Sequence, residues 1–307
     1  MSAAAPVSVV TGAFSYTGSH IAARLLADGE RVRTLSRRPS TTHPLSARVE
    51  YGALQFADPD RLRADLRGAT TLYNTYWIRF PRGATTWDDV LRNTRVLLRA
   101  AAEAGVRRVV HVSVTGARED SPLPYYAFKA RAERAVREAG LESHAILRPT
   151  LVFARGDVLL NNVAWLLRRL PVFVIPGTGA YRVQPVAAED VAELAVALGR
   201  HEADTTADAA GPDALAFAAL VRMVRAATGA RCRLVHAPPR VALALAGAAG
   251  VVRGDALVTG DELAGVMAEL LVSADPPAGR RRLGDWLAAE GPALGRVFVS
   301  ERDRNWS

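Results

Sequence analysis

The stretch Thr11-Gly12-Ala13-Phe14-Ser15-Tyr16-Thr17-Gly18 lies between two segments of different periodicity and decides the fold of this 307-residue chain. Residues 7–11 form a β-branched run that predicts a strand. Residues 19–28 place apolar side chains at helical spacing up to Gly29. The quoted stretch is therefore the loop of a strand, loop and helix unit. Its glycines permit a tight turn and a close approach of the backbone to a ligand.

A glycine-containing loop between a first strand and a first helix is a binding site for dinucleotide phosphates, because the N–H groups of the helix N-terminus point at the anion. Ser15 occupies the place of the middle glycine of G-x-x-G-x-x-G loops, where its hydroxyl can donate to a phosphate oxygen. The alternative is a tight turn without a ligand. The residues expected to bind the cofactor are Gly12, Phe14, Ser15, Tyr16, Thr17 and Gly18.

The alternation of strands and helices continues to Pro149. Further strands are expected at residues 31–36, 49–56, 70–76, 108–114 and 144–147, and helices at 58–66, 87–104 and 123–139. Such βα units predict a parallel sheet with right-handed crossovers and helices on both faces. We expect an α/β fold, a doubly wound Rossmann sheet with a smaller, mostly helical C-terminal lobe that binds substrate.

The end of the second predicted strand, Leu35-Ser36-Arg37-Arg38, indicates which dinucleotide binds. An NAD site usually offers an acid to the adenosine ribose here, whereas this segment offers none and supplies two guanidinium groups. Charge therefore favours NADP over NAD, with Arg37 as the first partner of the 2′-phosphate and Ser36 and Arg38 in support. The alternative is a pair of solvated loop arginines.

The domain bounds follow from where the alternation loosens after Pro149. Later helices are expected at residues 157–169, 189–198, 215–227, 240–252 and 284–289. We expect residues 1–155 and 185–212 to form the NADP-binding Rossmann domain. Residues 156–184 and 213–307 are expected to form the smaller substrate lobe.

Lys129 is the only lysine in the chain, and it lies four residues after Tyr125. A compact ammonium one helical turn from a phenol can bind ribose hydroxyls and favour proton transfer from the phenol near neutral pH. Ser113 ends the preceding predicted strand, from which its hydroxyl can hold a substrate carbonyl oxygen. The alternative is a tyrosine packed on its helix and a lysine that serves only the ribose.

The chain resembles the short-chain dehydrogenase/reductase superfamily in residues 11–18, Ser113, Tyr125 and Lys129. The stretches at 120–125, 146–150, 161–165 and 185–191 resemble its atypical branch, which includes NmrA-like proteins and the complex I 39 kDa subunit. The resemblance implies NAD(P) binding, catalytic roles for Ser113, Tyr125 and Lys129, and a place for Asn93 near the water relay of the lysine.

We expect an NADPH-dependent reductase that acts on a carbonyl or activated double bond, with Tyr125 as the proton donor. Two alternatives stay open: an NAD(P)-dependent epimerase or isomerase, and a nucleotide-binding redox sensor or assembly subunit without turnover. Ser15 in the place of a glycine is the sequence feature that favours the sensor. The fold alone does not decide among them.

Aromatic residues mark the expected substrate side. Tyr76 and Trp77 follow the fourth strand, and ligands of open α/β sheets lie outside the carboxyl ends of the strands. With Tyr126, Phe153 and Trp165 they would suit an apolar or aromatic small molecule. The alternative is ordinary core packing.

Composition excludes other classes of function. The formal charge is +8, but the arginines form no basic tract and lack nucleic-acid motifs, so no nucleic acid is expected. The six histidines form no metal-ligand spacing, and Cys232 is alone. The N-terminus lacks the basic start of a signal peptide, which favours the cytoplasm. The apolar run 241–252 is too short to span a bilayer and is expected to be a buried helix. An oligomer stays possible.

Overall fold

The computed structural model describes residues 6–253, 255 and 257–300. The chain divides into two compact units. Unit 1 comprises Met1–Pro149 and Ala188–Ala209, and unit 2 comprises Thr150–Ala187 and Ala210–Ser307.

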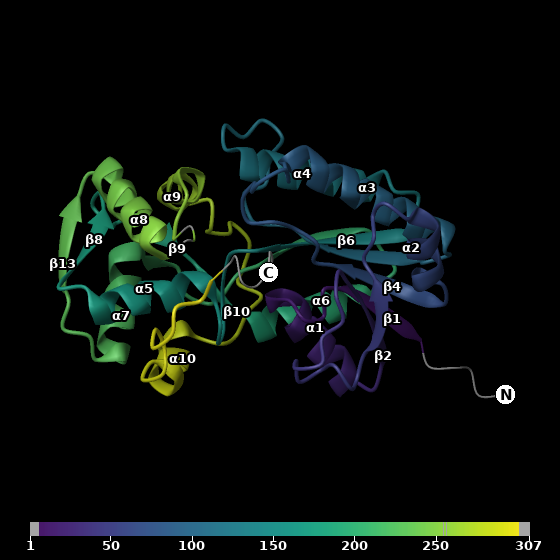
Figure 1. Cartoon of the computed structure of the whole chain (residues 1–307), viewed down its shortest axis with the longest axis horizontal. Helices are drawn as coiled ribbons and strands as arrows, with labels where there is room; N and C mark the ends of the chain where they lie inside the picture. Colours follow the sequence, from purple (N-terminus) through teal and green to yellow (C-terminus); the bar gives the residue numbers. More distant parts are fainter. Residues whose placement is uncertain (1–5, 254, 256, 301–307) are drawn as a thin grey trace. The chain divides into compact units, whose positions relative to one another are not determined.

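Unit 1 is built on a seven-stranded parallel sheet with the order β11-β6-β5-β4-β1-β2-β3 (Figure 1). The strands are β1 (Val7–Thr11), β2 (Arg31–Ser36), β3 (Glu50–Ala53), β4 (Ala69–Asn74), β5 (Arg108–Val112), β6 (Ser143–Pro149) and β11 (Thr205–Ala209). The strand order reverses between β1 and β4, which is the position where doubly wound sheets bind ligands. This arrangement confirms the predicted Rossmann fold.

Helices cover both faces of this sheet (Figure 1). One face carries α2 (Pro59–Leu66), α3 (Trp87–Glu103) and α4 (Pro124–Arg137), and the other carries α1 (Tyr16–Ala27) and α6 (Ala188–Gly199). Local sequence sets the start of these helices. Asp58 accepts from the N–H of Arg61 at the start of α2, and Thr86 and Asp89 form a capping box at the start of α3.

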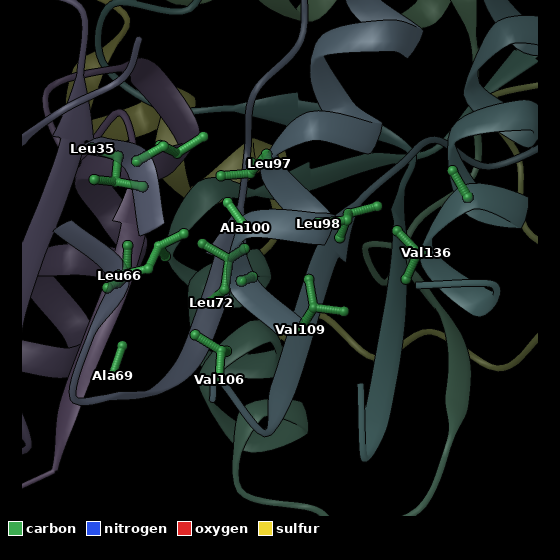
Figure 2. Packing of buried hydrophobic residues seen from close by; sticks show 14 of the residues in the cluster. Leu35, Leu66, Ala69, Leu72, Leu97, Leu98, Ala100, Val106, Val109 and Val136 are labelled. Carbon is green, nitrogen blue, oxygen red and sulfur yellow. The ribbon is translucent and has the colours of Figure 1, made fainter. Parts of the chain in front are cut away.

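One hydrophobic core of unit 1 lies between the sheet and helices α2, α3 and α4. Leu35, Leu72 and Val109 come from three strands and are fully buried, and Leu97 and Leu98 of α3 pack onto them (Figure 2). Burial on both faces explains why these strands read as apolar runs rather than as alternating patterns.

Unit 2 combines helices with three short strand pairs. Its helices are α5 (Val158–Arg169), α7 (Phe217–Thr228), α8 (Pro239–Arg253), α9 (Gly260–Met267) and α10 (Leu283–Glu290). Its strand pairs are β7 (Leu151–Phe153) with β10 (Pro185–Ala187), β8 (Val172–Pro176) with β13 (Arg233–Ala237), and β9 (Arg182–Val183) with β12 (Leu215–Ala216). Most of its residues outside loops are helical, as expected for this lobe.

The helix predicted at residues 240–252 is present as α8, but the expectation that the apolar run 241–252 is buried is wrong. Val241 is 46% exposed and Leu245 is 52% exposed, so one side of α8 presents apolar side chains to solvent. An apolar run indicates burial only where other elements cover all sides of the helix, and here they do not. Among the residues that the structure describes, no helix is long and apolar enough to cross a bilayer.

The sequence analysis does not predict the short strands of unit 2 or β11, the seventh strand of unit 1. Strands of two or three residues, such as β9 and β7, are too short to show a period. The edge strand β11 has the sequence Thr-Thr-Ala-Asp-Ala, which lacks the apolar run of a central strand. Helix α9 is also absent from the prediction, although Thr259 and Glu262 form a capping box at its start.

Candidate functional site

The predicted phosphate loop joins β1 to α1. Gly12 has a φ of +73°, which favours glycine, and its N–H donates to the carbonyl oxygen of Leu35 over 2.7 Å. Ser15 is the N-cap of α1, and its Oγ accepts from the N–H of Gly18 over 3.4 Å. An acceptor role leaves the proton of the Ser15 hydroxyl available to an anion.

Gly18 closes this loop by a contact that no other residue permits. A Cβ atom at Gly18 would lie 2.2 Å from the carbonyl oxygen of Gly12. Any side chain would therefore force the turn open and move the N-terminus of α1 away from β1. The glycine pair is a requirement of the turn, and the turn presents the N–H groups of α1 at the carboxyl edge of the sheet.

The end of β2 lies beside this loop. The Ser36 hydroxyl is buried and lies 2.9 Å from the Thr34 hydroxyl, which accepts from the N–H of Ala13 over 2.9 Å. Ser36 therefore stabilises the loop indirectly, through the Thr34 hydroxyl. Arg37 and Arg38 are exposed, where guanidinium groups can meet a ligand phosphate.

Aromatic rings flank the loop. The rings of Phe14 and His43 lie 5.3 Å apart, and those of Tyr16 and His20 lie 5.9 Å apart. Thr17 is partly buried in the first turn of α1. The predicted cofactor residues thus gather around one helix N-terminus and the end of β2.

A buried polar network lies where the strand order reverses. Thr11 Oγ1 donates to Asn74 Oδ1 over 3.2 Å and accepts from the N–H of Thr75 over 2.7 Å. Asn74 Nδ2 lies 3.1 Å from Nδ1 of His111, which is fully buried. Within the described residues, Nε2 of His111 has no hydrogen-bond partner. Burial, with the charge of Lys129, lowers the pKa of His111 to about 3, so its ring stays neutral.

Lys129 lies almost completely buried on α4 and is 3% exposed. Its Nζ donates to the carbonyl oxygen of Val112 over 3.0 Å, and the ring of Trp77 lies 4.3 Å from Nζ. Burial lowers the pKa of Lys129 from its ordinary 10.5 to about 7, and the carboxylate of Glu133 opposes this shift. The lysine therefore titrates near neutral pH.

Ser113 has a different partner from the one expected. Its Oγ donates to Oε1 of Glu133 over 2.6 Å, and Glu133 is 1% exposed. Glu133 also accepts from Nε and Nη2 of Arg148 over 2.8 and 2.5 Å and from Arg137 over 3.2 Å. In this arrangement the proton of Ser113 points at a buried carboxylate rather than at a substrate position.

Tyr125 belongs to an aromatic cluster above Lys129. The ring of Trp77 stacks on Trp87 with centroids 5.6 Å apart and meets Tyr125 edge-on at 6.3 Å. Tyr125 meets Trp87 at 5.8 Å and Tyr126 at 5.4 Å, both edge-on. Trp77 contacts both Tyr125 and Lys129, so the structure brings the predicted phenol and amine to one cluster. Within the described chain, the buried Nε1 of Trp77 has no hydrogen-bond partner.

Asn93 contacts Tyr76 rather than the lysine. Its Nδ2 donates to the Tyr76 hydroxyl over 3.0 Å, and burial raises the pKa of that hydroxyl. Tyr76 in turn packs on Phe56, with ring centroids 4.7 Å apart. The role of Asn93 in a water relay stays a prediction.

The two predicted substrate residues of unit 2 lie among other side chains of that unit. Phe153 is fully buried in its core and packs on Trp286 with centroids 5.3 Å apart. Trp165 on α5 meets Phe298 at 5.4 Å and lies under the guanidinium of Arg169. Phe153 therefore lies in the core of unit 2, and its role in substrate binding stays a prediction.

Sequence reasoning missed the groups that surround the predicted ones. The predicted site lacks four buried or partly buried groups of this network: Glu133 contacts Ser113, Arg148 contacts Glu133, Asn74 contacts His111, and His111 interacts electrostatically with Lys129. The sequence signal that could have indicated this network is Glu133, a carboxylate one helical turn after Lys129 on a face whose other buried residues are Tyr, Ala and Val.

Comparison with known families agrees with this geometry. Residues 12–163 match a protein-family model described as NAD(P)H-binding. The chain therefore contains an NAD(P)H-binding domain of the Rossmann type, as the loop and the resemblance imply.

Several curated proteins are similar to this chain. A ceramide reductase of Caulobacter vibrioides is 31% identical over 63% of this chain and 61% of its own length. Sterol demethylase protein B of Methylococcus capsulatus is 38% identical over 36% of this chain and 35% of its own length. The mitochondrial NADH-ubiquinone oxidoreductase 40 kDa subunit of Neurospora crassa is 25% identical over 78% of this chain and 65% of its own length. The chain thus spans less than two thirds of the length of each of these relatives. Because one of them is mitochondrial, the cytoplasmic location stays a prediction.

Solved structures show the same fold. The NADPH-dependent quinone oxidoreductase QOR2 of Escherichia coli, complexed with NADPH, has a TM-score of 0.74 at 17% identity, over 92% of this chain and 99% of its own. A nucleoside-diphosphate-sugar epimerase of Staphylococcus aureus has a TM-score of 0.72 at 15% identity, over 92% of this chain and 99% of its own. Reductases and epimerases share this architecture, so the chemistry must be argued from the side chains.

Replacement of Lys129 by Met is expected to change how stability depends on pH. The unfolded lysine titrates at 10.5 and the folded lysine at about 7, so the unfolded state binds more protons between these values. The free energy of unfolding of the wild type should therefore rise with pH across this window, relative to Lys129→Met. Urea unfolding at a series of pH values measures the difference.

The matched control is Arg134→Met, which removes an exposed cation from the same helix. It should keep the pH dependence of the wild type. The free energies of unfolding of the wild type and Lys129→Met should differ by an amount that changes with pH. A difference that stays constant from pH 7 to pH 10 would contradict the burial of a titrating lysine.

Proposed function

We propose that this protein is an NADPH-dependent reductase of a carbonyl or activated double bond on an apolar or aromatic small molecule. The observation that carries the proposal is the position of Lys129. The only lysine of the chain is buried at the carboxyl edge of a dinucleotide-binding sheet, in contact with a ring that also contacts Tyr125.

The residues at the predicted cofactor site fit a dinucleotide phosphate. The Gly12 and Gly18 contact leaves room only for backbone, and Ser15 retains a hydroxyl proton at the N-terminus of α1. Arg37 supplies an exposed guanidinium where a 2′-phosphate would lie in a Rossmann site, and no acid of β2 competes for that place. NADPH, when bound, supplies a hydride to the substrate.

The chain itself supplies the proton. Tyr125 Oη donates to the substrate oxygen or carbon that becomes negatively charged, and Lys129, one turn away, binds ribose hydroxyls through its Nζ. Because the indole of Trp77 covers Nζ, the proposal requires this ring to move when the ribose hydroxyls bind.

Ser113 takes a secondary role in this proposal. Its proton is held by Glu133, and a hydrogen bond to a buried carboxylate is worth about 1.5–3 kcal/mol. Ser113 can polarise a substrate oxygen only after that bond breaks. We therefore assign the main interaction with the substrate oxygen to Tyr125.

The substrate class rests on the aromatic cluster. Trp77, Trp87 and Tyr125 offer ring edges and faces that suit a flat or apolar molecule. Two similar proteins, a ceramide reductase and a quinone oxidoreductase, are named for apolar compounds, which supports an apolar acceptor.

Tyr125→Phe is expected to lower turnover by a factor of about 100 or more, because general acid catalysis contributes about 10²–10⁴-fold. NADPH oxidation with quinones, enones and aromatic ketones measures turnover, and NADPH fluorescence measures binding, which should stay unchanged. Ser113→Ala should lower turnover less than Tyr125→Phe.

The control is Tyr181→Phe, which removes a buried hydroxyl in unit 2 that has no hydrogen-bond partner among the described residues. It should keep wild-type turnover. Equal turnover in Tyr125→Phe and the wild type would remove Tyr125 from the mechanism.

Arg37→Ala is expected to weaken NADPH binding by about tenfold, the value of one charge-assisted hydrogen bond. NADH lacks the 2′-phosphate, so its affinity is the internal control and should not change. Titration of both cofactors by fluorescence measures this. An equal loss for both would assign Arg37 to the adenine or ribose instead.

A second candidate, a nucleotide sensor without turnover, is favoured by the covered lysine and by the engagement of Ser113 with Glu133. NADPH binding without oxidation by any acceptor, together with a partner captured only in the presence of NADP, would support it. Net NADPH consumption would exclude both the sensor and an epimerase that recycles its nucleotide.

A further inference from the structure

The net charge of the chain is concentrated in two segments of unit 2. Neither residues 158–187 nor residues 214–254 contain Asp or Glu, and together they hold nine of the 39 basic residues. The other residues of the chain comprise 30 basic and 31 acidic ones, so they are close to neutral. The formal charge of +8 therefore belongs to these two segments.

The fold brings the two segments together. Strand β8 of the first pairs in parallel with β13 of the second, with Val172 opposite Arg233 and Val174 opposite Val235. Phe173 is buried in the core of unit 2, and side chains alternate along a strand. Val172, Val174, Arg233 and Val235 therefore share the face of this strand pair that points away from that core.

Large apolar side chains are exposed on the same segments. Of the seven large hydrophobic residues exposed in the described chain, five lie here: Leu170 (42%), Val172 (40%), Val235 (39%), Val241 (46%) and Leu245 (52%). Val241 and Leu245 are four residues apart, so they lie on one face of α8. Single exposed hydrophobic residues are ordinary, but their concentration in one part of a unit indicates an interaction surface.

Exposed arginines are interspersed with these apolar side chains. Arg231, Arg233 and Arg240 are exposed and lie within the acid-free segment 214–254. Among the described residues, the ion pair recorded for an arginine of the two segments joins Arg182 to Glu269 of α9. We call the exposed side chains of β8, β13 and the first half of α8, with the adjoining Leu170 and Arg231, the acid-free face.

We propose that the acid-free face binds the surface of an anionic lipid bilayer. Aliphatic side chains enter the boundary between headgroups and acyl chains, and the arginines bind the phosphates and carboxylates of anionic lipids. Helix α8 has 15 residues and is about 22 Å long, which is less than the ~30 Å of a hydrocarbon core. The helix therefore lies on the membrane and does not cross it.

The charge of the face distinguishes lipid from other partners. A symmetric dimer through this face would place two acid-free arginine-rich faces against each other, which costs electrostatic energy. A nucleic acid would match the charge but would leave Val241 and Leu245 without an apolar partner. An anionic bilayer offers both a negative surface and an apolar interior to the same residues.

Co-sedimentation with lipid vesicles tests this proposal. The wild type should bind vesicles of equal amounts of phosphatidylcholine and phosphatidylserine, bind phosphatidylcholine alone weakly, and lose binding at high salt. Arg231→Glu, Arg233→Glu and Arg240→Glu combined should weaken binding at least a hundredfold, because each basic residue at a membrane contributes about a fivefold factor. Val241→Ser with Leu245→Ser should also weaken binding, although it changes no charge.

Matched variants separate the face from total charge. The control is a triple variant of three exposed arginines of α3 in unit 1, Arg92→Glu with Arg95→Glu and Arg99→Glu. It changes the net charge by the same amount and should keep vesicle binding. Tyr51→Ser removes an exposed apolar side chain outside the face and should also keep it. Circular dichroism checks that every variant is folded.

Three results would overturn the proposal. The first is a wild type that does not bind anionic vesicles, including one that binds an oligonucleotide duplex instead. The second is equal loss of binding in the α3 variant, which would make the effect one of net charge. The third is a dimer in light scattering that Val241→Ser with Leu245→Ser dissociates while vesicle binding is kept, which would assign the face to a second copy. None of these results depends on the proposed reductase activity.

Discussion

The carboxylate of Glu133 joins the helix that carries the candidate site to the two strands beside it. It is 1% exposed and accepts from Ser113 at the end of β5 and from Arg148 on β6. A buried carboxylate is stable only when its partners are in place, and removal of one partner of such a pair costs about 3–5 kcal/mol. The position of α4, and with it that of Tyr125 and Lys129, therefore depends on this set of hydrogen bonds.

The same carboxylate affects the lysine one turn before it. Burial lowers the pKa of Lys129 to about 7, and Glu133 opposes the shift. Without that carboxylate, the amine would lose more of its charge at neutral pH. Trp77 completes the surroundings of Nζ and adds a cation–π contact. An arginine is charged at every relevant pH and is larger, so it cannot replace the lysine here.

Much of the fold of unit 1 could be predicted because its signals are local. Buried parallel strands such as β1 and β2 read as apolar runs, and Gly29 and Gly105, both at positive φ, end α1 and α3. The spacing of Tyr125 and Lys129 is also local, since both lie on one helix. The partners of Ser113, Asn93 and Lys129 could not be predicted, because Glu133, Tyr76 and Trp77 reach them only through tertiary packing. The exposure of α8 likewise depends on which elements cover it, which the apolar pattern does not contain.

In the proposed function, Lys129 is a buried amine at the nicotinamide ribose position of an NADPH site. Because the chain has one lysine, protein labelled with ¹³C-lysine gives one set of side-chain signals in an NMR titration. We expect the ε-carbon signal to titrate with a pKa of about 7 and to shift when NADPH is added. A signal that titrates at the ordinary lysine value of 10.5 and does not respond to NADPH would contradict it.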